Sequence, residues 1–156
     1  MEQLIVGKSL EMQLAALLDT LPSDATVSYM VTRLNEGEEA TIVASSKETI
    51  VHTGASMVKT LILEYVFHLA AQEQLDLNDT IALSRSPRVE GAGALMELVG
   101  NHSFSYLELC RLMMVLSDNW ATNLLIQALG MENINARAEQ LGLEHFEINR
   151  MMMDFT

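Results

Sequence analysis

The stretch Thr53–Glu73, TGASMVKTLILEYVFHLAAQE, decides the fold of this chain. Within it, Met57–Ala71 is almost entirely apolar, and neither Pro nor Gly interrupts the run. An apolar run of this length predicts a helix that is apolar on nearly every face, and such a helix belongs in the middle of a domain. The run is too short, and too interrupted by Lys59, Glu64 and His68, to span a bilayer.

One residue breaks the local rules of this helix. Lys59 falls in the first turn, where the helix dipole is positive and disfavours a cation. Ser56 precedes it by three positions, so the two side chains share one face. The dipole and desolvation would both lower the pKa of the lysine, and a neutral amine could accept the serine proton. The spacing therefore suggests a Ser-Lys nucleophilic pair.

A structural explanation competes with this hypothesis. Ser-x-x-Lys is expected by chance about once in every one or two chains of this size. Thr53–Ala55 give a turn-like beginning, so Ser56 could simply cap the helix while Lys59 extends to solvent. The two explanations differ in one testable respect. Catalysis needs the Lys59 amine, whereas a capping role tolerates Lys59→Ala.

The composition is that of a globular domain. The chain has 156 residues, 49% of them hydrophobic and 19% charged, which is enough for a sizeable core. The formal net charge of −12 argues against a phosphate-backbone partner, so we expect no nucleic-acid binding. The single Cys110 allows no internal disulfide, and the four histidines show no metal-ligand spacing. We predict neither a metal nor a cofactor.

The first residues, MEQLIVGKSLEMQ, lack the basic segment and apolar core of a secretory signal. The sequence as given therefore predicts a cytoplasmic protein without a membrane segment. A periplasmic or secreted location is the alternative, if a signal has been removed.

The residues before the central stretch predict a helix and a hairpin. Apolar positions along Gln3–Leu21 indicate an amphipathic helix that Pro22 ends. Val27–Leu34 and Ala40–Ser45 are rich in β-branched and apolar residues, and the tight connection Asn35–Gly37 joins them. A lone hairpin is marginal in water, so it needs more sheet or a covering helix.

The residues after the central stretch are mainly helical. Pro and Gly make 84–95 a loop, and Ser105 and Glu108 have the spacing of a capping box. Glycines end the two helices that follow. The predicted helices are 105–116, 120–130 and 131–141.

A second polar group, Ser117–Asn119, lies between two apolar helices. Ser, Asp and Asn are all good N-cap residues, so a cap is the structural explanation. A Ser-Asp-Asn tripeptide is expected by chance in only about one such chain in forty. Here it follows the Ser-x-x-Lys motif along the chain, and the occurrence of both motifs in this order favours a functional interpretation of each.

Together these motifs resemble a known family. Ser56–Lys59, Val89–Gly93 and Ser117–Asn119 are similar to the serine β-lactamase and penicillin-binding-protein superfamily, closest to class A β-lactamases. The separation of the two serines is close to that of the family, and Leu141–Arg150 resembles the start of its omega loop. The resemblance covers about the whole chain, from the first helix onward.

The resemblance implies a role for each motif residue. Ser56 would attack the carbonyl of a β-lactam or of a D-alanyl, peptidoglycan-like peptide, and Lys59 would accept its proton directly or through water. Ser117 would pass a proton to the leaving nitrogen, and Asn119 would hydrogen-bond the side-chain amide of the substrate. Asp118 would be structural. The backbone N–H of Ser56 would supply half of an oxyanion hole.

Three departures from the family's pattern matter. The sequence has no Lys-Thr-Gly or Lys-Ser-Gly, the motif of a late strand that also supplies the second oxyanion N–H. Arg150, by resemblance the structural arginine of the omega loop, is followed by Met151–Met153 and Asp154, where the family has its deacylating glutamate. The chain ends at Thr156, where the family continues with further helices and strands.

We therefore expect an α+β, mostly helical, partial β-lactamase/transpeptidase-like fold. Residues 1–55 would carry the N-terminal helix and hairpin, and residues 56–156 the helical domain with the Ser-x-x-Lys helix and the start of the omega loop. Without the late strands the hairpin would keep an open apolar edge. We predict that this edge is covered in a homo-oligomer or by a complementing C-terminal segment.

The predicted function is that of a β-lactamase-like serine hydrolase that forms an acyl-enzyme at Ser56. Its turnover would be impaired, because the second oxyanion donor and the deacylating glutamate are missing. Two alternatives stay open. One is a low-turnover penicillin binder or esterase on the same scaffold, and the other is a non-catalytic helical interaction module.

Overall fold

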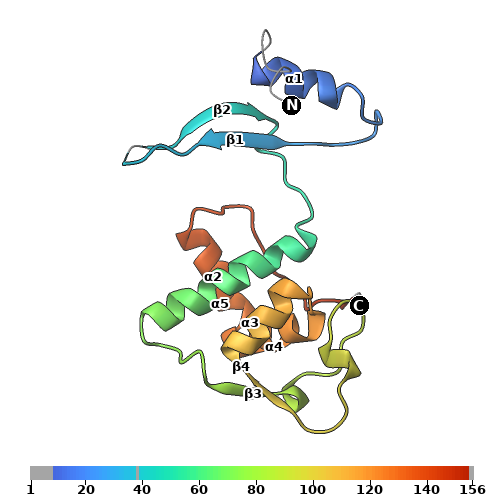
Figure 1. The fold of residues 1–156 in the computed structure, drawn as a ribbon, viewed down its shortest axis with the longest axis vertical. Coiled ribbons are helices and arrows are strands. Elements are labelled where there is room, and N and C mark those ends of the chain that lie inside the picture. Colours follow the sequence, from blue (N-terminus) through green and yellow to red (C-terminus); the bar gives the residue numbers. More distant parts are fainter. Residues whose placement is uncertain (1–8, 38, 155–156) are drawn as a thin grey trace. The chain divides into compact units, whose positions relative to one another are not determined.

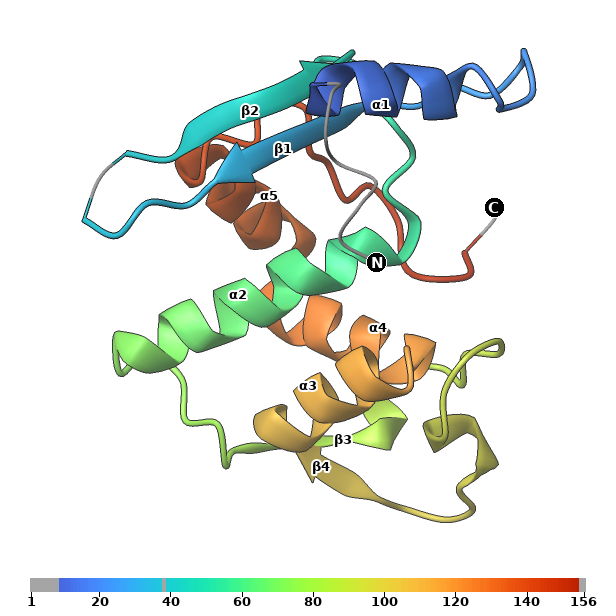
Figure 2. The same cartoon turned by 45° about the horizontal axis from the view of Figure 1, so that its top comes forward.

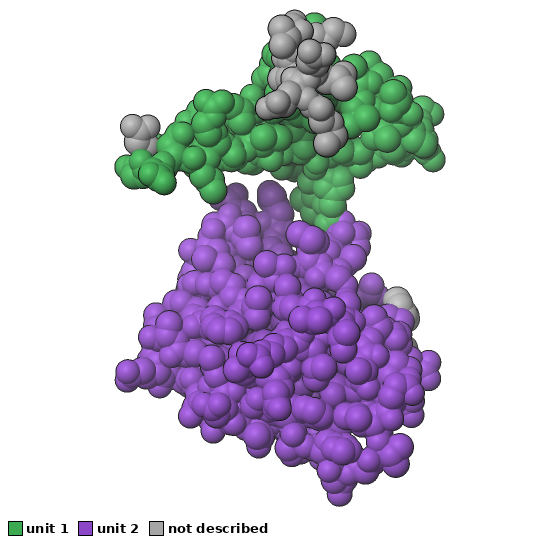
Figure 3. Space-filling model, in the orientation of Figure 1, with its two compact units in different colours: residues 1–52 green, residues 53–156 purple. Residues whose placement is uncertain are grey.

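The structure is a computed structural model that describes residues 9–37 and 39–154. Two units are distinguished, one within residues 1–52 and one within residues 53–156 (Figure 3). The predicted functional division at residue 55 stays a prediction.

The described residues of the first unit form one helix and one hairpin (Figure 1). Helix α1 (Leu10–Leu18) begins at Ser9, whose side chain accepts a hydrogen bond from the backbone N–H of Met12. The predicted residues 3–8 of this helix lie outside the described part of the chain. The helix ends before the predicted Leu21, because the chain turns through 3₁₀-type bonds before Pro22.

The predicted hairpin is present in the structure. Strands β1 (Tyr29–Arg33) and β2 (Thr41–Ser46) pair antiparallel, with a register shift between Val31 and Thr32. Such a bulge increases the local twist of the strand pair. The predicted assembly through the edge of this hairpin stays a prediction.

The described residues of the second unit include four α-helices (Figure 2). They are α2 (Val58–Ala71), α3 (Tyr106–Val115), α4 (Asn119–Leu129) and α5 (Met131–Gln140). Helix α2 contacts each of the other three, and α4 does the same. The bounds of α3, α4 and α5 confirm the three helices predicted for this region.

Helix α4, not α2, is the most buried helix of the second unit. Every residue of Asn119–Ile126 is buried. On α2 the buried apolar side chains, Leu61, Ile62 and Val66, lie on one face, and Phe67 is 44% exposed. Helix α2 therefore belongs to the core, as expected, but its fully buried apolar residues lie on one face. An apolar composition gave the helix, but the packing partners cover only part of its circumference.

A short antiparallel strand pair, β3 (Thr80–Ala82) with β4 (Ser103–Ser105), was not expected from the sequence. Strands of three residues are too short to show a period of two. Ser105 also begins α3 through the predicted capping box, because its hydroxyl accepts from Glu108 N and the Glu108 carboxylate accepts from Ser105 N.

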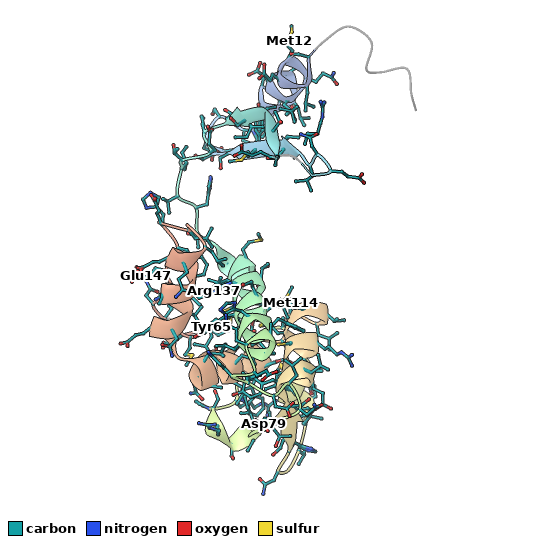
Figure 4. All side chains as sticks on the ribbon, turned by 90° about the vertical axis from the view of Figure 1, so that its left-hand side faces the viewer. Met12, Tyr65, Asp79, Met114, Arg137 and Glu147 are labelled. Atoms are coloured by element: carbon teal, nitrogen blue, oxygen red, sulfur yellow. The ribbon has the colours of Figure 1, made fainter. Side chains whose placement is uncertain are left out.

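An ion pair joins α2 to α5. One edge of the Arg137 guanidinium donates two hydrogen bonds to the Glu64 carboxylate, with Nε 3.0 Å from Oε2 and Nη2 paired with Oε1. Arg137 and Tyr65 are labelled beside this contact in Figure 4. The bond from Arg137 holds the pKa of the Glu64 carboxyl below its ordinary value.

Candidate active site

The centre of the site is the amine of Lys59, in the first turn of α2. The side chain is only 3% exposed. Its Nζ lies 3.3 Å from Ser56 Oγ, 2.8 Å from both Ser117 Oγ and Ser117 O, and 3.1 Å from Asn119 Oδ1. Ser56, Ser117 and Asn119, which come from two motifs about 60 positions apart, thus meet at one nitrogen atom. Lys59 does not extend to solvent.

Ser56 lies in a 3₁₀ turn, Ala55–Met57, that leads directly into α2. The residue is exposed, so its hydroxyl is open to a ligand. In the described residues, Gly54 and Met57 occupy the N-cap positions of the turn and of α2, and neither cap has a side-chain hydrogen bond. Ser56 is therefore not the cap that the structural explanation required. Its described side-chain contact is the one with the Lys59 amine.

Ser117 comes from the short connection between α3 and α4. Its φ of 54° lies in the left-handed region, which a non-glycine residue adopts at a cost. Both its carbonyl oxygen and its hydroxyl reach the Lys59 amine. The unusual backbone of Ser117 therefore coincides with two contacts to the buried Lys59 amine.

Asp118 holds this connection in place. Its side chain is 1% exposed and caps α4 by accepting from Ala121 N at 2.9 Å. The other carboxylate oxygen accepts from Ala94 N at 2.7 Å and Leu95 N at 2.9 Å. A buried carboxylate needs such donors, since an unpaired one costs several kcal/mol (on the order of 3–5). Asp118 thus ties the Ser117–Asn119 turn to the loop before residue 95.

An uncharged amine can satisfy the contacts of Lys59. All four acceptors are neutral oxygen atoms, and the Ser117 carbonyl and Asn119 Oδ1 can only accept. A neutral amine can give its two N–H groups to these two oxygens and keep its lone pair for a hydroxyl proton. Burial lowers the pKa of Lys59 from its ordinary value of 10.5, and the nearby Asp118 carboxylate opposes part of that shift.

The segment that resembles the start of the omega loop is fixed to α4. Asn123, which is 4% exposed, donates from Nδ2 to Met152 O at 3.1 Å and accepts from Met152 N at 2.7 Å. Arg150 donates to Asp154 O at 3.1 Å within the same segment. Sequence reasoning missed Asn123. The signal was an amide beside the apolar run Leu124–Ile126 of a largely buried helix, where a polar side chain needs a partner.

A cavity of about 530 Å³ lies between this segment and the loop before Gly91. It is lined by parts of 86–90, by Asn123 and Gln127 of α4, and by 151–154. A second hollow, of about 410 Å³, lies at the other end of α2 around Ala70 and Leu75. The second hollow has no contact with the Lys59 centre among its lining residues.

Within residues 9–37 and 39–154, no three His, Cys, Asp or Glu side chains gather as they would around a metal ion. In the same residues, no helix is both long and apolar enough to cross a membrane. The buried thiol of Cys110 has its pKa raised to about 11 by desolvation, and it takes no part in the Lys59 centre.

Comparison with known proteins decides the family. The sequence model of the β-lactamase enzyme family matches residues 9–156. This chain belongs to the β-lactamase enzyme family. Its α+β fold is that of part of a class A β-lactamase, as the sequence motifs predicted.

Individual relatives of this β-lactamase family member agree with that assignment. β-Lactamase BRO-1 of Moraxella catarrhalis is 31% identical over 97 residues, which cover 58% of this chain and 31% of BRO-1. The structure of PBP-A matches with a TM-score of 0.74 at 26% identity, covering 91% of this chain and 52% of PBP-A. A β-lactamase from Sphaerobacter thermophilus matches with a TM-score of 0.69 at 26% identity, over 80% of this chain and 45% of that one. The chain spans about half the length of these solved relatives.

Proposed function

We propose that this β-lactamase family member reacts with β-lactams through an acyl-enzyme at Ser56. The observation that carries the proposal is the buried Lys59 amine within hydrogen-bond distance of two hydroxyls, those of Ser56 and Ser117. One of these hydroxyls is exposed and can attack, and the other can relay a proton. A variant of PBP-A with a similar fold is described as an acyl-enzyme complex with penicillin G, which supports the substrate class.

Acylation would begin with proton transfer from Ser56 Oγ to the neutral Lys59 amine. The oxygen forms a bond to the lactam carbonyl carbon, and the negative charge moves to the carbonyl oxygen. The backbone N–H of Ser56 would be one donor to this oxyanion. Because Lys59 is desolvated and its pKa lowered, the transfer needs no second base.

Collapse of the intermediate would break the carbon–nitrogen bond of the lactam. Ser117 Oγ would donate its proton to the leaving nitrogen and recover one from the Lys59 ammonium, 2.8 Å away. The amine is then neutral again, and the proton of Ser56 has in effect moved to the nitrogen. The Asn119 amide would bind the acyl side-chain amide of the substrate, with its oxygen kept on Lys59.

Release of the acyl group would be slow. Hydrolysis of the ester needs a base that activates water, and the residues that follow Arg150 are Met151–Met153, without a carboxylate. Both backbone groups of Met152 are bonded to Asn123, which fixes this segment to α4. We therefore propose a penicillin-reactive protein of low turnover. A D-alanyl peptide is the second substrate class that the same centre would accept.

The experiment is intact-protein mass spectrometry after incubation with penicillin G. We expect one penicillin adduct per chain, which is absent in Ser56→Ala and present in a control, Ser84→Ala, that removes another exposed serine hydroxyl. An adduct that forms equally in Ser56→Ala would refute the nucleophile. Absence of both an adduct and penicillin consumption would refute acylation by this chain and favour a non-catalytic helical interaction module.

A further inference from the structure

Gly91 lies against the side chain of Asn119 with no room for a substituent. A Cβ atom at this position would lie 2.9 Å from Asn119 Nδ2, closer than real Cβ contacts. On its other side it would meet the Met153 thioether, with Cε at 3.6 Å and Sδ at 3.7 Å. The φ of Gly91 is 102°, which L side chains rarely adopt.

The loop that carries Gly91 cannot move away from Asn119 to make room. The backbone N–H of Asn119 donates to Ala92 O at 3.0 Å. Two residues further on, a Cβ at Gly93 would lie 2.3 Å from the Asp118 carboxylate, and the N–H groups of Ala94 and Leu95 are bonded to that carboxylate. Hydrogen bonds on both sides of Gly91 therefore fix the loop to the turn that carries Ser117 and Asn119.

The Asn119 side chain has two functional ends. Its oxygen accepts from the Lys59 amine at 3.1 Å, and its nitrogen is the end that Gly91 approaches. A substituent on Gly91 would press on the nitrogen. Because the amide is planar, it would turn or move as a whole, and both ends would lose their positions.

We propose that Gly91 is a positioning residue, which by lacking a side chain holds the Asn119 amide with its oxygen on Lys59 and its nitrogen free for the acyl-side-chain amide of a β-lactam. This proposal rests on the function proposed above and adds a determinant of substrate selection. It implies that a substituent on Gly91 slows acylation by β-lactams that carry an acyl amide more than acylation by those that carry a bare amine there.

The test compares acylation by penicillin G, which has the acyl amide, with acylation by 6-aminopenicillanic acid, which lacks it. We expect Gly91→Ala to lower the ratio of the two acylation rates about tenfold, the order of one lost hydrogen bond. The matched control is Gly100→Ala, because Gly100 has a φ of 99° and nothing within 4 Å of the added Cβ. The two positions have nearly the same positive φ, and only the Cβ added at Gly91 meets Asn119.

A double-variant cycle tests whether Gly91 acts through Asn119. In an Asn119→Ser background the shorter side chain clears the space, so Gly91→Ala should no longer change the ratio. An equal fall for both compounds, an unchanged ratio, or a further change in the Asn119→Ser background would overturn the proposal.

A second measurement does not depend on acylation. The side-chain NH₂ resonances of Asn119, followed by NMR in the unmodified chain, should shift in Gly91→Ala and stay in place in Gly100→Ala. If no penicillin acylates the chain, the proposed function fails while this spectrum still tests the positioning role. Unchanged Asn119 resonances in Gly91→Ala would overturn that role whatever the chain does with penicillin.

Discussion

Helices α2 and α4 both begin at the candidate site, and they begin in opposite ways. The first turn of α4 is capped by Asp118, whose carboxylate takes three backbone N–H groups. The first turn of α2 has no side-chain cap among the described residues and contains a buried lysine. The start of α4 is therefore satisfied by the Asp118 carboxylate. The start of α2 instead contains the Lys59 amine, whose charged form the helix dipole disfavours.

The two helix starts therefore have different roles in the account: that of α4 holds the site in place, and that of α2 carries the proposed reaction. The capped start of α4 fixes Ser117 and Asn119, whereas the uncapped start of α2 leaves Ser56 exposed beside a base with a lowered pKa. Local rules are broken where the proposed reaction occurs and obeyed at the helix that supports it. Each substitution below acts on one side of this comparison.

The largest expected effect is on chemistry at α2. Lys59→Ala should lower the rate of acylation by penicillin about 10³-fold, because a positioned general base contributes roughly 10²- to 10⁴-fold. The rate is measured by mass spectrometry or with a fluorescent penicillin. Lys47→Ala, at an exposed lysine, is the control and should react normally. Full reactivity of Lys59→Ala would show that the reaction does not need the Lys59 amine and would remove Lys59 from the mechanism.

The next largest effect is expected on stability, at the capped start of α4. Asp118→Asn should destabilise the second unit by about 2–3 kcal/mol, because one backbone donor then faces an NH₂ group inside the protein. Urea unfolding gives the free energy. Asp79→Asn, at an exposed aspartate, should change it by about 0.5 kcal/mol or less. Equal stabilities for the two variants would show that Asp118 does not fix the turn.

A smaller effect is expected where the loop packs on Asp118. Gly93→Ala should cost about 1–3 kcal/mol more than Gly100→Ala, because only the first Cβ overlaps the carboxylate. Both positions have a φ that L residues rarely adopt. The difference in stability between the two variants therefore measures the overlap of the added Cβ with Asp118. Thermal unfolding of the two variants in parallel measures it. No difference would mean that the loop yields at little cost.

The lowered pKa of Lys59 predicts two pH dependences with the same sign. Acylation should speed up as pH rises through this pKa, which lies below 10.5, because the neutral amine is the reactive form. Between that pKa and 10.5 the unfolded chain binds more protons than the folded one, so the free energy of unfolding should also rise with pH. Lys59→Met should flatten this rise. A fall of acylation with pH over the same window would contradict a neutral base.

The smallest effect is expected at the ion pair between Glu64 of α2 and Arg137 of α5. The pKa of Glu64 is held below 4.5, so the pair stabilises the fold above that pH and is lost as pH falls through the lowered pKa. Glu64→Gln should therefore lower the free energy of unfolding at neutral pH. It should also reduce the fall of this free energy as the pH becomes acidic. The Glu64 side chain is 37% exposed, so solvent screens the interaction. Urea unfolding at neutral and acid pH measures both effects. Equal free energies of unfolding for Glu64→Gln and the original chain at both pH values would show that the ion pair contributes nothing.

Sequence reasoning reached those features that have local signals. The capping box of Ser105 and Glu108 fixed the start of α3, and Gly130 marked the end of α4. The β-branched run and the turn at Asn35–Gly37 gave the hairpin. The motif serines and Lys59 could be paired because both motifs belong to one family pattern.

The remaining features depend on contacts between distant segments. Strands β3 and β4 are three residues each and carry no periodic pattern. The Asn123 bonds to Met152 join positions 29 apart, and the clearance at Gly91 is set by Asn119. A glycine in a loop looks the same in sequence whether it turns the chain or makes room for a neighbour. Only the packed structure distinguishes the two.

The most direct test of the central claim is the protonation of Lys59 itself. The chain has three lysines, so the ¹³Cε resonance of Lys59 in lysine-labelled protein can be assigned with Lys59→Ala and Lys47→Ala and followed against pH. We predict a titration midpoint for Lys59 clearly below 10.5, with that of Lys47 as the internal reference. A Lys59 midpoint at or above 10.5 would mean that the amine stays charged beside Ser56, and it would contradict the account of Lys59 as the base.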